Sequence, residues 1–407
     1  MTIKNICTSD WGIPDSGSKR WAPLMPDMYA TYWPYAINRE SGDNRGFKFH
    51  GQFAHARYQS FHVYDDSTGH LVWPDGGPQS SLLDCVIEPD ENNENPYRPK
   101  ANRNTETRDY TVWIVPEGSD TSTYANQHNV ITFPQSVVRL SVYLRVYLPD
   151  ENLKHHPNYL SGGVPLPEIE CFDTAHPEQP AECPTARLIA GLGQKPKGPG
   201  ENKDGEVHFY RISAGDYYRN EHSAYLATVF KDLKGTVAVI KFKPPTFTDT
   251  SNQNDTFPQD QTELRYWSLN VGSGQLTNTT ACLVDYQATV AKDGFVYVAL
   301  GKALPHIIEH ARGLNFLPWG PRREGPEGEE GDDTIVLIYR HMVIDTDFHH
   351  SAADVTPFDP DKVDENDPET RYSQAADRQI GEYAPIGRYF TEAEFLENFG
   401  NVDVNFA

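Results

Sequence analysis

The sequence contains little cysteine, little positive charge and no long hydrophobic run. Its 407 residues include five cysteines without a Cys-x-x-Cys pair, and 35 basic against 58 acidic residues leave a net charge of −23. This charge repels nucleic-acid phosphates and anionic lipid surfaces. No apolar segment reaches the roughly 18 residues of a membrane-spanning helix, and the start of the chain lacks the apolar stretch of a signal peptide. We therefore expect a cytoplasmic protein that binds neither nucleic acid nor membrane.

The cysteine content favours reduced thiols in a cytoplasm. Cys171 and Cys183 flank the proline-rich segment 176–180 and are the pair whose placement is compatible with a disulfide. Whether they pair stays open at this point.

Aromatic residues are plentiful, at 12% of the chain, and the dominant hydrophobic period is two, that of a β-strand. From Val137 to Leu148 apolar residues alternate with others, which predicts a strand with one buried face. Further strands are expected over 56–64, 82–87, 110–115, 207–212, 236–242, 264–270, 281–289, 294–300 and 334–344. A capping box from Thr391 to Glu394 predicts a short helix. The sequence therefore predicts an all-β fold with few short helices.

Four segments recur along the chain in the same order. Residues 57–61 resemble 265–269, 82–85 resemble 283–286, 110–114 resemble 294–298, and 143–146 resemble 338–341. The offsets drift gradually, as loop insertions would produce, which predicts two tandem jelly-roll-like antiparallel β-sandwich repeats. The expected parts are an N-terminal segment (1–45), repeat one (46–160), a Pro/Gly-rich connector (161–204), repeat two (205–348) and an acidic tail with a short helix (349–407).

Several of these segments resemble an uncharacterised bacterial family of paired β-sandwich proteins. They are Ala56–Tyr58, Phe61–Asp66 with Gly69, Tyr147–Asp150, and Asn315–Pro321, which is similar to the NWLP-A-P segment of that family. The resemblance covers about half of each repeat. It implies the jelly-roll-like fold and brings no reaction, cofactor or catalytic residue.

Arginine and aspartate also recur. Each half has one Arg at the start of a strand, one at the end of a strand and one Asp between them; they are Arg57, Arg145 and Asp84, then Arg265, Arg340 and Asp285. If the strands are neighbours, each Asp can pair with an Arg of its own half. Recurrence in both halves favours a buried ion pair that fixes strand register over a ligand site.

One segment has the spacing of a metal site. His306 to His310 reads His-x-x-Glu-His, as in some zinc hydrolases. Pro305 and Gly313 leave room for about two helical turns without a third ligand, so a short connecting helix is the favoured interpretation. Because dinucleotide, P-loop and Cys-based zinc patterns are also missing, we expect no metal and no organic cofactor.

An aromatic face is the remaining candidate site. Period-two geometry places Tyr58, His62 and Tyr64 on one side of their strand. We predict His62, Tyr58 and Tyr143 as catalytic residues, and Tyr64, Arg145, Tyr147, Trp73 and His55 as substrate-binding residues. His62 is the preferred acid or base because its ordinary pKa lies near neutrality. Packing between the two repeats would use the same aromatic residues, and the sequence does not separate these two interpretations.

Three functions are compatible with these features. The first is a cofactor-independent enzyme of specialised metabolism that cyclises, isomerises or dehydrates a hydrophobic small molecule in an aromatic pocket. The second is a non-catalytic protein that binds a small molecule or carbohydrate, with Trp73 as a typical contact. The third is a zinc-dependent hydrolase built on His306 and His310. The expected partner is a hydrophobic small molecule, and a homodimer stays open.

Overall fold

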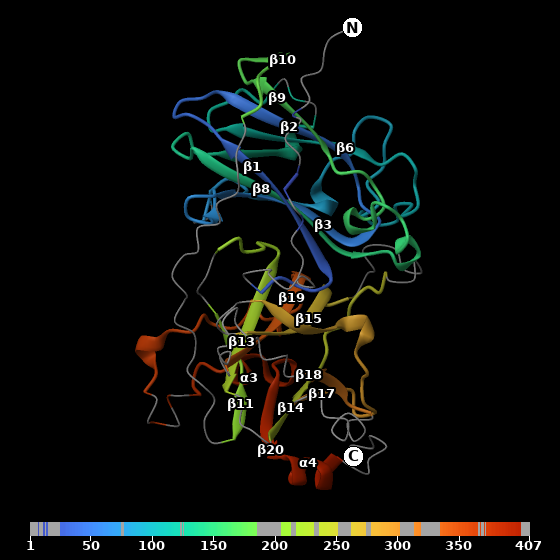
Figure 1. Ribbon diagram of the computed structural model, residues 1–407, viewed down its shortest axis with the longest axis vertical. Coiled ribbons are helices and arrows are strands. Elements are labelled where there is room, and N and C mark those ends of the chain that lie inside the picture. The colour runs from blue at the N-terminus through green and yellow to red at the C-terminus, as the bar shows by residue number, and fades with distance from the viewer. Residues whose placement is uncertain are drawn as a thin grey trace, which may run out of the picture.

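The computed structural model describes residues 7, 11–12, 14, 25–74, 77–122, 124, 126–184, 205–212, 217–231, 236–250, 262–273, 278–301, 313–318, 334–364, 367, 370 and 372–399. These residues form an all-β structure of two β-sandwiches, one above the other in Figure 1. The expected all-β fold with few short helices is thereby confirmed, whereas a jelly-roll-like duplication stays a prediction. None of the helices in this part of the chain is long and apolar enough to span a membrane.

The first sandwich consists of two five-stranded sheets. Its strands are β1 (Ala30–Asn38), β2 (Arg45–Gln52), β3 (Ala56–Asp65), β4 (His70–Leu71), β5 (Ser81–Leu83), β6 (Asp109–Pro116), β7 (Val130–Phe133), β8 (Arg139–Pro149), β9 (Glu168–Asp173) and β10 (His176–Pro180). One sheet has the order β1-β8-β3-β4, with β5 also paired to β3, and the other has the order β10-β9-β2-β6-β7. Phe61 and Val142 from the first sheet meet Phe49 and Ile114 from the second in the buried core.

The second sandwich also has two five-stranded sheets. Its strands are β11 (Glu206–His208), β12 (Tyr210–Arg211), β13 (Ser223–Lys231), β14 (Thr236–Phe242), β15 (Leu264–Ser273), β16 (Thr279–Val284), β17 (Val296–Gly301), β18 (Asn315–Pro318), β19 (Thr334–Ile344) and β20 (Ile386–Thr391). The orders are β12-β13-β19-β15-β16 and β11-β20-β14-β17-β18. Leu269 and Leu337 pack against Ile240 and Val298 between these sheets.

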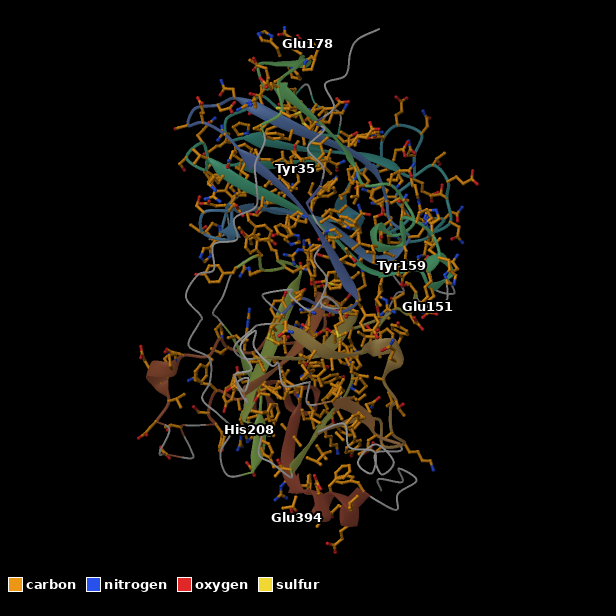
Figure 2. All side chains as sticks on the ribbon, in the orientation of Figure 1. Tyr35, Glu151, Tyr159, Glu178, His208 and Glu394 are labelled. Carbon is orange, nitrogen blue, oxygen red and sulfur yellow. A yellow bond between two sulfur atoms is a disulfide. The ribbon has the colours of Figure 1, made fainter. Side chains whose placement is uncertain are left out.

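Helices are few and short among the described residues. In that part of the chain the α-helices are α3 (Asp377–Ile380) and α4 (Glu392–Phe399). Single 3₁₀ turns are η1 (Asp84–Val86), η2 (Gln127–Asn129), η3 (Glu151–Leu153), η4 (Tyr159–Ser161), η5 (Asp285–Gln287), η6 (Pro360–Lys362) and η7 (Gly381–Tyr383). The capping box is present, because the Glu394 N–H donates to Thr391 Oγ1 and the Thr391 N–H donates to the Glu394 carboxylate. Figure 2 labels Glu394 at one end of the molecule.

Equivalent strands occupy equivalent places in the two sandwiches. The order β1-β8-β3-β5 corresponds to β13-β19-β15-β16, and β9-β2-β6-β7 corresponds to β20-β14-β17-β18. Register agrees as well, since Ser60 lies opposite Arg145 and Ser268 lies opposite Arg340. Leu148 and Val343, at matching ends of β8 and β19, both have positive φ angles. Residues can therefore be compared position by position between the sandwiches.

The two sandwiches pack face to face through β1-β8-β3 and β13-β19-β15. We call this interface the seam. Its apolar centre consists of Ala30, Tyr32, Tyr58, Tyr147, Leu148, Tyr266, Val284 and Met342. The side of β3 and β8 that the alternating pattern leaves outside the first core is therefore buried by the second sandwich (Figure 1). The expectation of one solvent-facing side on β8 was wrong for this reason.

The strands also extend beyond the expected domain limits. β1 precedes residue 46, β9 and β10 lie inside the expected connector, and β20 of the expected tail pairs with β14. Cys183 forms a disulfide with Cys7, whereas Cys171 is a buried thiol. Disulfides persist mainly in oxidising compartments. This bond therefore does not support the expected cytoplasmic location, which stays a prediction.

Candidate functional site

Two ion pairs cross the seam reciprocally. Arg57 of the first sandwich contacts Asp285 of the second at 2.5 Å, and Arg265 of the second contacts both carboxylate oxygens of Asp84 at 2.7 and 2.8 Å. Burial raises the pKa of Asp84 and of Asp285, and the partner guanidinium opposes that rise. The expected pairing of Asp and Arg within one half is wrong. Each sandwich instead supplies one aspartate and one arginine that pair with residues of the other sandwich.

A second reciprocal contact holds a tyrosine of each sandwich. The Tyr58 hydroxyl lies 3.0 Å from Asn220 Oδ1, and the Tyr266 hydroxyl donates to Asp27 at 2.8 Å. Asn220 and Asp27 occupy equivalent positions before β13 and β1, and each accepts the backbone N–H two residues later. Asp27 carries a negative charge and Asn220 does not. Asp27 therefore forms an ion pair with Arg340.

Arg145, the equivalent of Arg340, has different partners. It donates to the Tyr64 hydroxyl and to the backbone carbonyl of Tyr218, and its guanidinium lies 5.3 Å from the Tyr32 ring centre. Within the described chain no carboxylate forms an ion pair with Arg145. Its positive charge therefore acts on the neighbouring histidines.

His62 lies in the interior of the seam with no exposed surface. Its Nε2 accepts the Glu221 N–H at 3.1 Å, so Nδ1 carries the proton toward Ser60 Oγ at 3.2 Å. Burial, helped by Arg145 and His222, lowers its pKa well below the ordinary value. Both ring nitrogens are thus occupied by protein.

The structure brings most of the other predicted residues into the same seam. Tyr58, Tyr64, Arg145 and Tyr147 are all buried there, and Tyr143 packs edge-on against Tyr64. The Tyr147 hydroxyl contacts that of Tyr32 at 2.9 Å, and its ring packs edge-on against Tyr58 and Tyr266.

Trp73 and His55 lie in loops of the first sandwich. The Trp73 indole donates to the Thr132 carbonyl at 2.8 Å, and its ring packs against the first core. Burial lowers the pKa of His55 to about 4, with contributions from Arg108 and Arg103.

Among the positions that differ chemically between the two sandwiches, four lie together at the seam. Ladder register matches Ser81 to Cys282 and His62 to Asn270. The segments before β1 and β13 match Glu221 to Met28 and His222 to Tyr29. The first member of each pair is a hydroxyl, an imidazole or a carboxylate, whereas the second is a thiol, an amide, a thioether or a phenol. The four first members are Ser81, His62, Glu221 and His222.

These four residues form one hydrogen-bonded cluster at one edge of the seam, which we call the Ser81–His222 edge. Ser81 Oγ lies 3.1 Å from His222 Nε2 and donates to Glu221 at 2.7 Å. His222 Nδ1 lies 2.8 Å from the Tyr58 hydroxyl. His62 is in ring contact with His222, with the ring centres 5.0 Å apart. His222 is partly exposed and Glu221 is exposed, whereas Ser81 keeps 7% of its surface.

The imidazole of His222 is neutral near pH 7. Burial lowers its pKa to about 3, and Arg145 and Arg265 add to this effect. Two proton arrangements satisfy the cluster. In one, Tyr58 donates to Asn220 and His222 Nδ1–H donates to Tyr58, which leaves Nε2 as an acceptor for Ser81. In the other, Tyr58 donates to Nδ1 and Nε2–H donates to Ser81, whose hydroxyl points to Glu221.

Sequence reasoning identified Tyr58 and His62 but missed Ser81, Glu221 and His222. Ser81 lies on a three-residue strand and His222 lies in a turn, so neither belongs to a periodic pattern. The corresponding strand orders of the two sandwiches carry the missing signal, because aligning β1 with β13 and β5 with β16 exposes the positions that differ. The His306–His310 motif lies outside the described residues. Among the described residues no group of three or more His, Cys, Asp or Glu is placed to hold a metal ion.

Comparison with known proteins gives similarity at the level of structure. An uncharacterised protein from Burkholderia cenocepacia is similar with a TM-score of 0.49 and 11% identity, over 95% of this chain and 83% of that chain. The VPA0106 protein from Vibrio parahaemolyticus is similar with a TM-score of 0.39 and 12% identity, over 80% of this chain and 86% of that chain. No family model and no curated protein sequence matches the chain.

Proposed function

We propose that the chain is a cofactor-independent enzyme that acts on a hydrophobic small molecule by acid–base chemistry, with His222 as the acid–base group. Cyclisation, isomerisation and dehydration are reactions that an acid–base group and an enclosing protein surface can catalyse without a cofactor. The observation that carries the proposal is the convergence of Ser81, His62, Glu221 and His222 at one edge of the seam.

The argument depends on which residues recur. A residue that fixes the packing of two similar sandwiches is needed on both, as are Arg57 and Arg265, or Tyr58 and Tyr266. A reacting group is needed once. Ser81, His62, Glu221 and His222 do not recur and so meet the second condition, and their hydrogen bonds and ring contact bring them together at one edge.

His222 is better placed for the reaction than His62. It is partly exposed, whereas His62 is fully buried and uses both ring nitrogens within the protein. Tyr58 contacts His222 Nδ1 and orients the ring, so it keeps a role as a positioning residue. Tyr64 and Arg145 support the adjoining wall of the seam.

The electrostatics suit a step in which negative charge develops on the substrate. Arg145 and Arg265 add to the effect of burial in lowering the pKa of His222. The same two cations also stabilise an anion that forms beside the imidazole ring. His222 is already neutral near pH 7 and accepts a proton without first losing one. The base is weak, so it works best when the substrate becomes anionic in the same step.

An untargeted assay tests this proposal on many candidate substrates at once. The full chain and its His222→Gln variant are incubated with a small-molecule extract, and mass spectrometry compares consumption and formation of compounds. Substitution of exposed His128 by Gln is the matched control. We expect a compound change with the wild type and the control that falls at least about 100-fold with His222→Gln. No change, or a change that His222→Gln leaves intact, would contradict the proposal.

Non-catalytic ligand binding is the second candidate, and the opposite edge of the seam favours it. Tyr29 and Tyr286 are partly exposed there, with ring centres 6.4 Å apart, and the Tyr29 hydroxyl donates to Gln287. Half-exposed aromatic rings beside an amide are compatible with a sugar or other amphipathic ligand. Calorimetric titration with a panel of sugars, repeated with Tyr286→Ala, measures this; binding without turnover of any compound would favour this candidate over the enzyme.

A further inference from the structure

We infer that Ser81 is a nucleophile that His222 activates, and that the substrate class is an ester or thioester with an uncharged acyl group. The inference rests on the proposed function, because it assigns a reaction to the same His222. It names acyl transfer to Ser81, followed by hydrolysis, as that reaction.

The geometry combines three parts of an activated nucleophile. Ser81 Oγ lies 3.1 Å from His222 Nε2, His222 Nδ1 lies 2.8 Å from the Tyr58 hydroxyl, and that hydroxyl lies 3.0 Å from Asn220 Oδ1. When Tyr58 donates to Asn220, it accepts from His222 Nδ1–H. Nε2 then presents its lone pair to the serine. A nucleophile, a base and a group that orients the base are the recurrent elements of serine-dependent acyl transfer.

The surrounding framework holds this chain of contacts in place. Asn220 also accepts the His222 backbone N–H at 3.0 Å, which fixes the turn that carries the imidazole. Ser81 belongs to β5, whose described pairing is to β3, where it lies opposite His62. The opposite edge has Cys282 and Tyr29 at these positions, so no imidazole lies at the place equivalent to His222. The arrangement is therefore not repeated at the equivalent place in the other sandwich.

Glu221 competes with His222 for the Ser81 proton. Its carboxylate accepts from Ser81 at 2.7 Å but is exposed, whereas His222 is held by Tyr58 and by the seam. Water can replace Ser81 as a partner of the carboxylate at little cost. We therefore expect Glu221 to hold the serine in the resting state without being required for reaction.

The same carboxylate indicates the charge of the substrate. Glu221 lies beside the nucleophile, and the chain as a whole has a net charge of −23. Both repel an anionic acyl group. Val86 is an exposed apolar residue at the end of η1, the turn that directly follows the strand of Ser81. An uncharged, apolar acyl group fits these features.

The chemical step balances without an external oxidant or reductant. The Ser81 hydroxyl proton passes to His222 Nε2 as Oγ bonds to the acyl carbon. The bond from that carbon to the alcohol or thiol then breaks, and the leaving group takes the proton from Nε2. Water, deprotonated by the same nitrogen, attacks the acyl-serine and regenerates Ser81 with release of the acid.

A fluorophosphonate probe tests the inference on the full chain. The probe forms a covalent adduct with activated serines, and peptide mass spectrometry locates it; release of p-nitrophenol from p-nitrophenyl butyrate gives the rate. We expect an adduct on Ser81 that disappears with Ser81→Ala and with Ser81→Cys, a change that installs the residue found at the equivalent position 282. With His222→Gln, labelling and ester hydrolysis should fall about 100-fold or more.

One variant serves as a matched control. Ser67→Ala removes an exposed serine in the turn after β3 and should leave labelling unchanged. Unchanged near-ultraviolet circular dichroism shows that each variant is folded.

The outcomes distinguish this inference from the proposed function. Absence of an adduct on Ser81, or an adduct that His222→Gln does not slow, overturns the nucleophile. If the His222-dependent compound change persists in Ser81→Ala, the nucleophile fails and the acid–base enzyme stands. If neither adduct nor compound change occurs, both fail.

Discussion

Asp84 offers a direct measure of how the seam stabilises the molecule. Its carboxylate is fully buried, accepts the N–H groups of Gln59 and Cys85, and receives Arg265 from the second sandwich on both oxygens. Asp84→Asn keeps the shape of the side chain but removes its charge. Arg265 then loses its buried counter-charge.

The expected cost follows from the burial of this pair. Removing one partner of a buried ion pair costs about 3–5 kcal/mol, since the other charge stays desolvated. Asp285→Asn is the matched substitution across the seam and should cost less, about 1–3 kcal/mol. The reason is that Arg57 keeps a second carboxylate, Asp249, at 3.1 Å, whose side chain is 39% exposed.

Urea unfolding followed by tryptophan fluorescence measures both free energies of unfolding. The double variant Asp84→Asn with Arg265→Met should be more stable than Asp84→Asn alone, because it also removes the buried guanidinium whose contact with the Asp84 carboxylate is lost. A loss below about 1 kcal/mol for Asp84→Asn would refute the reasoning. So would an equal or larger loss for Asp285→Asn, or strict additivity in the double variant.

Three further predictions follow from other parts of the structure. The pKa values of His55, His222 and His341 are lowered to about 4, 3 and 3, so each binds a proton in the unfolded chain before the folded one, and stability should fall as pH drops from 6.5 toward 4. Near pH 5 each contributes about 1.4 kcal/mol per pH unit, and urea unfolding of His341→Gln should show a slope smaller by that amount; an unchanged slope contradicts it. Cys7→Ser opens a cross-link between residues 176 apart in sequence, worth roughly 5 kcal/mol by chain entropy, and calorimetry under oxidising conditions should give a lower Tm than for the control Cys171→Ser. Thr391→Ala removes the N-cap of α4 and should lower the stability of that helix by about 1 kcal/mol. Hydrogen exchange of the amides in α4 should become correspondingly faster, whereas exchange in β14 should not change.

The strands were predictable because alternation is a local property of the sequence. Leu140, Val142, Leu144 and Val146 all enter the core of the first sandwich, as the pattern between Val137 and Leu148 indicates. What covers the other face of β8 was not predictable. Tyr143, Arg145 and Tyr147 are amphipathic, and such residues suit both a solvent-facing wall and an interface between sheets.

The candidate site was predictable in part for the same reason. Tyr58 and His62 share a face because of strand geometry, whereas Asn220 and His222 reach them from a turn before β13. No periodicity connects residues so distant in sequence. The recurring Arg and Asp were recognised from sequence, but their exchange across the seam was not, because recurrence alone does not show which copy a residue contacts.

The Asp27 and Asn220 pair links the stability of the seam to the candidate reaction. Asp27 gives Arg340 a carboxylate, and the equivalent Asn220 gives Arg145 none. A carboxylate at position 220 would lie against Tyr58 and His222 and would raise the pKa of that histidine. The neutral amide adds no charge there, so burial, with Arg145 and Arg265, keeps His222 in its neutral form. The difference between Asp27 and Asn220 that breaks the symmetry of the framework thus also favours the neutral histidine at the Ser81–His222 edge.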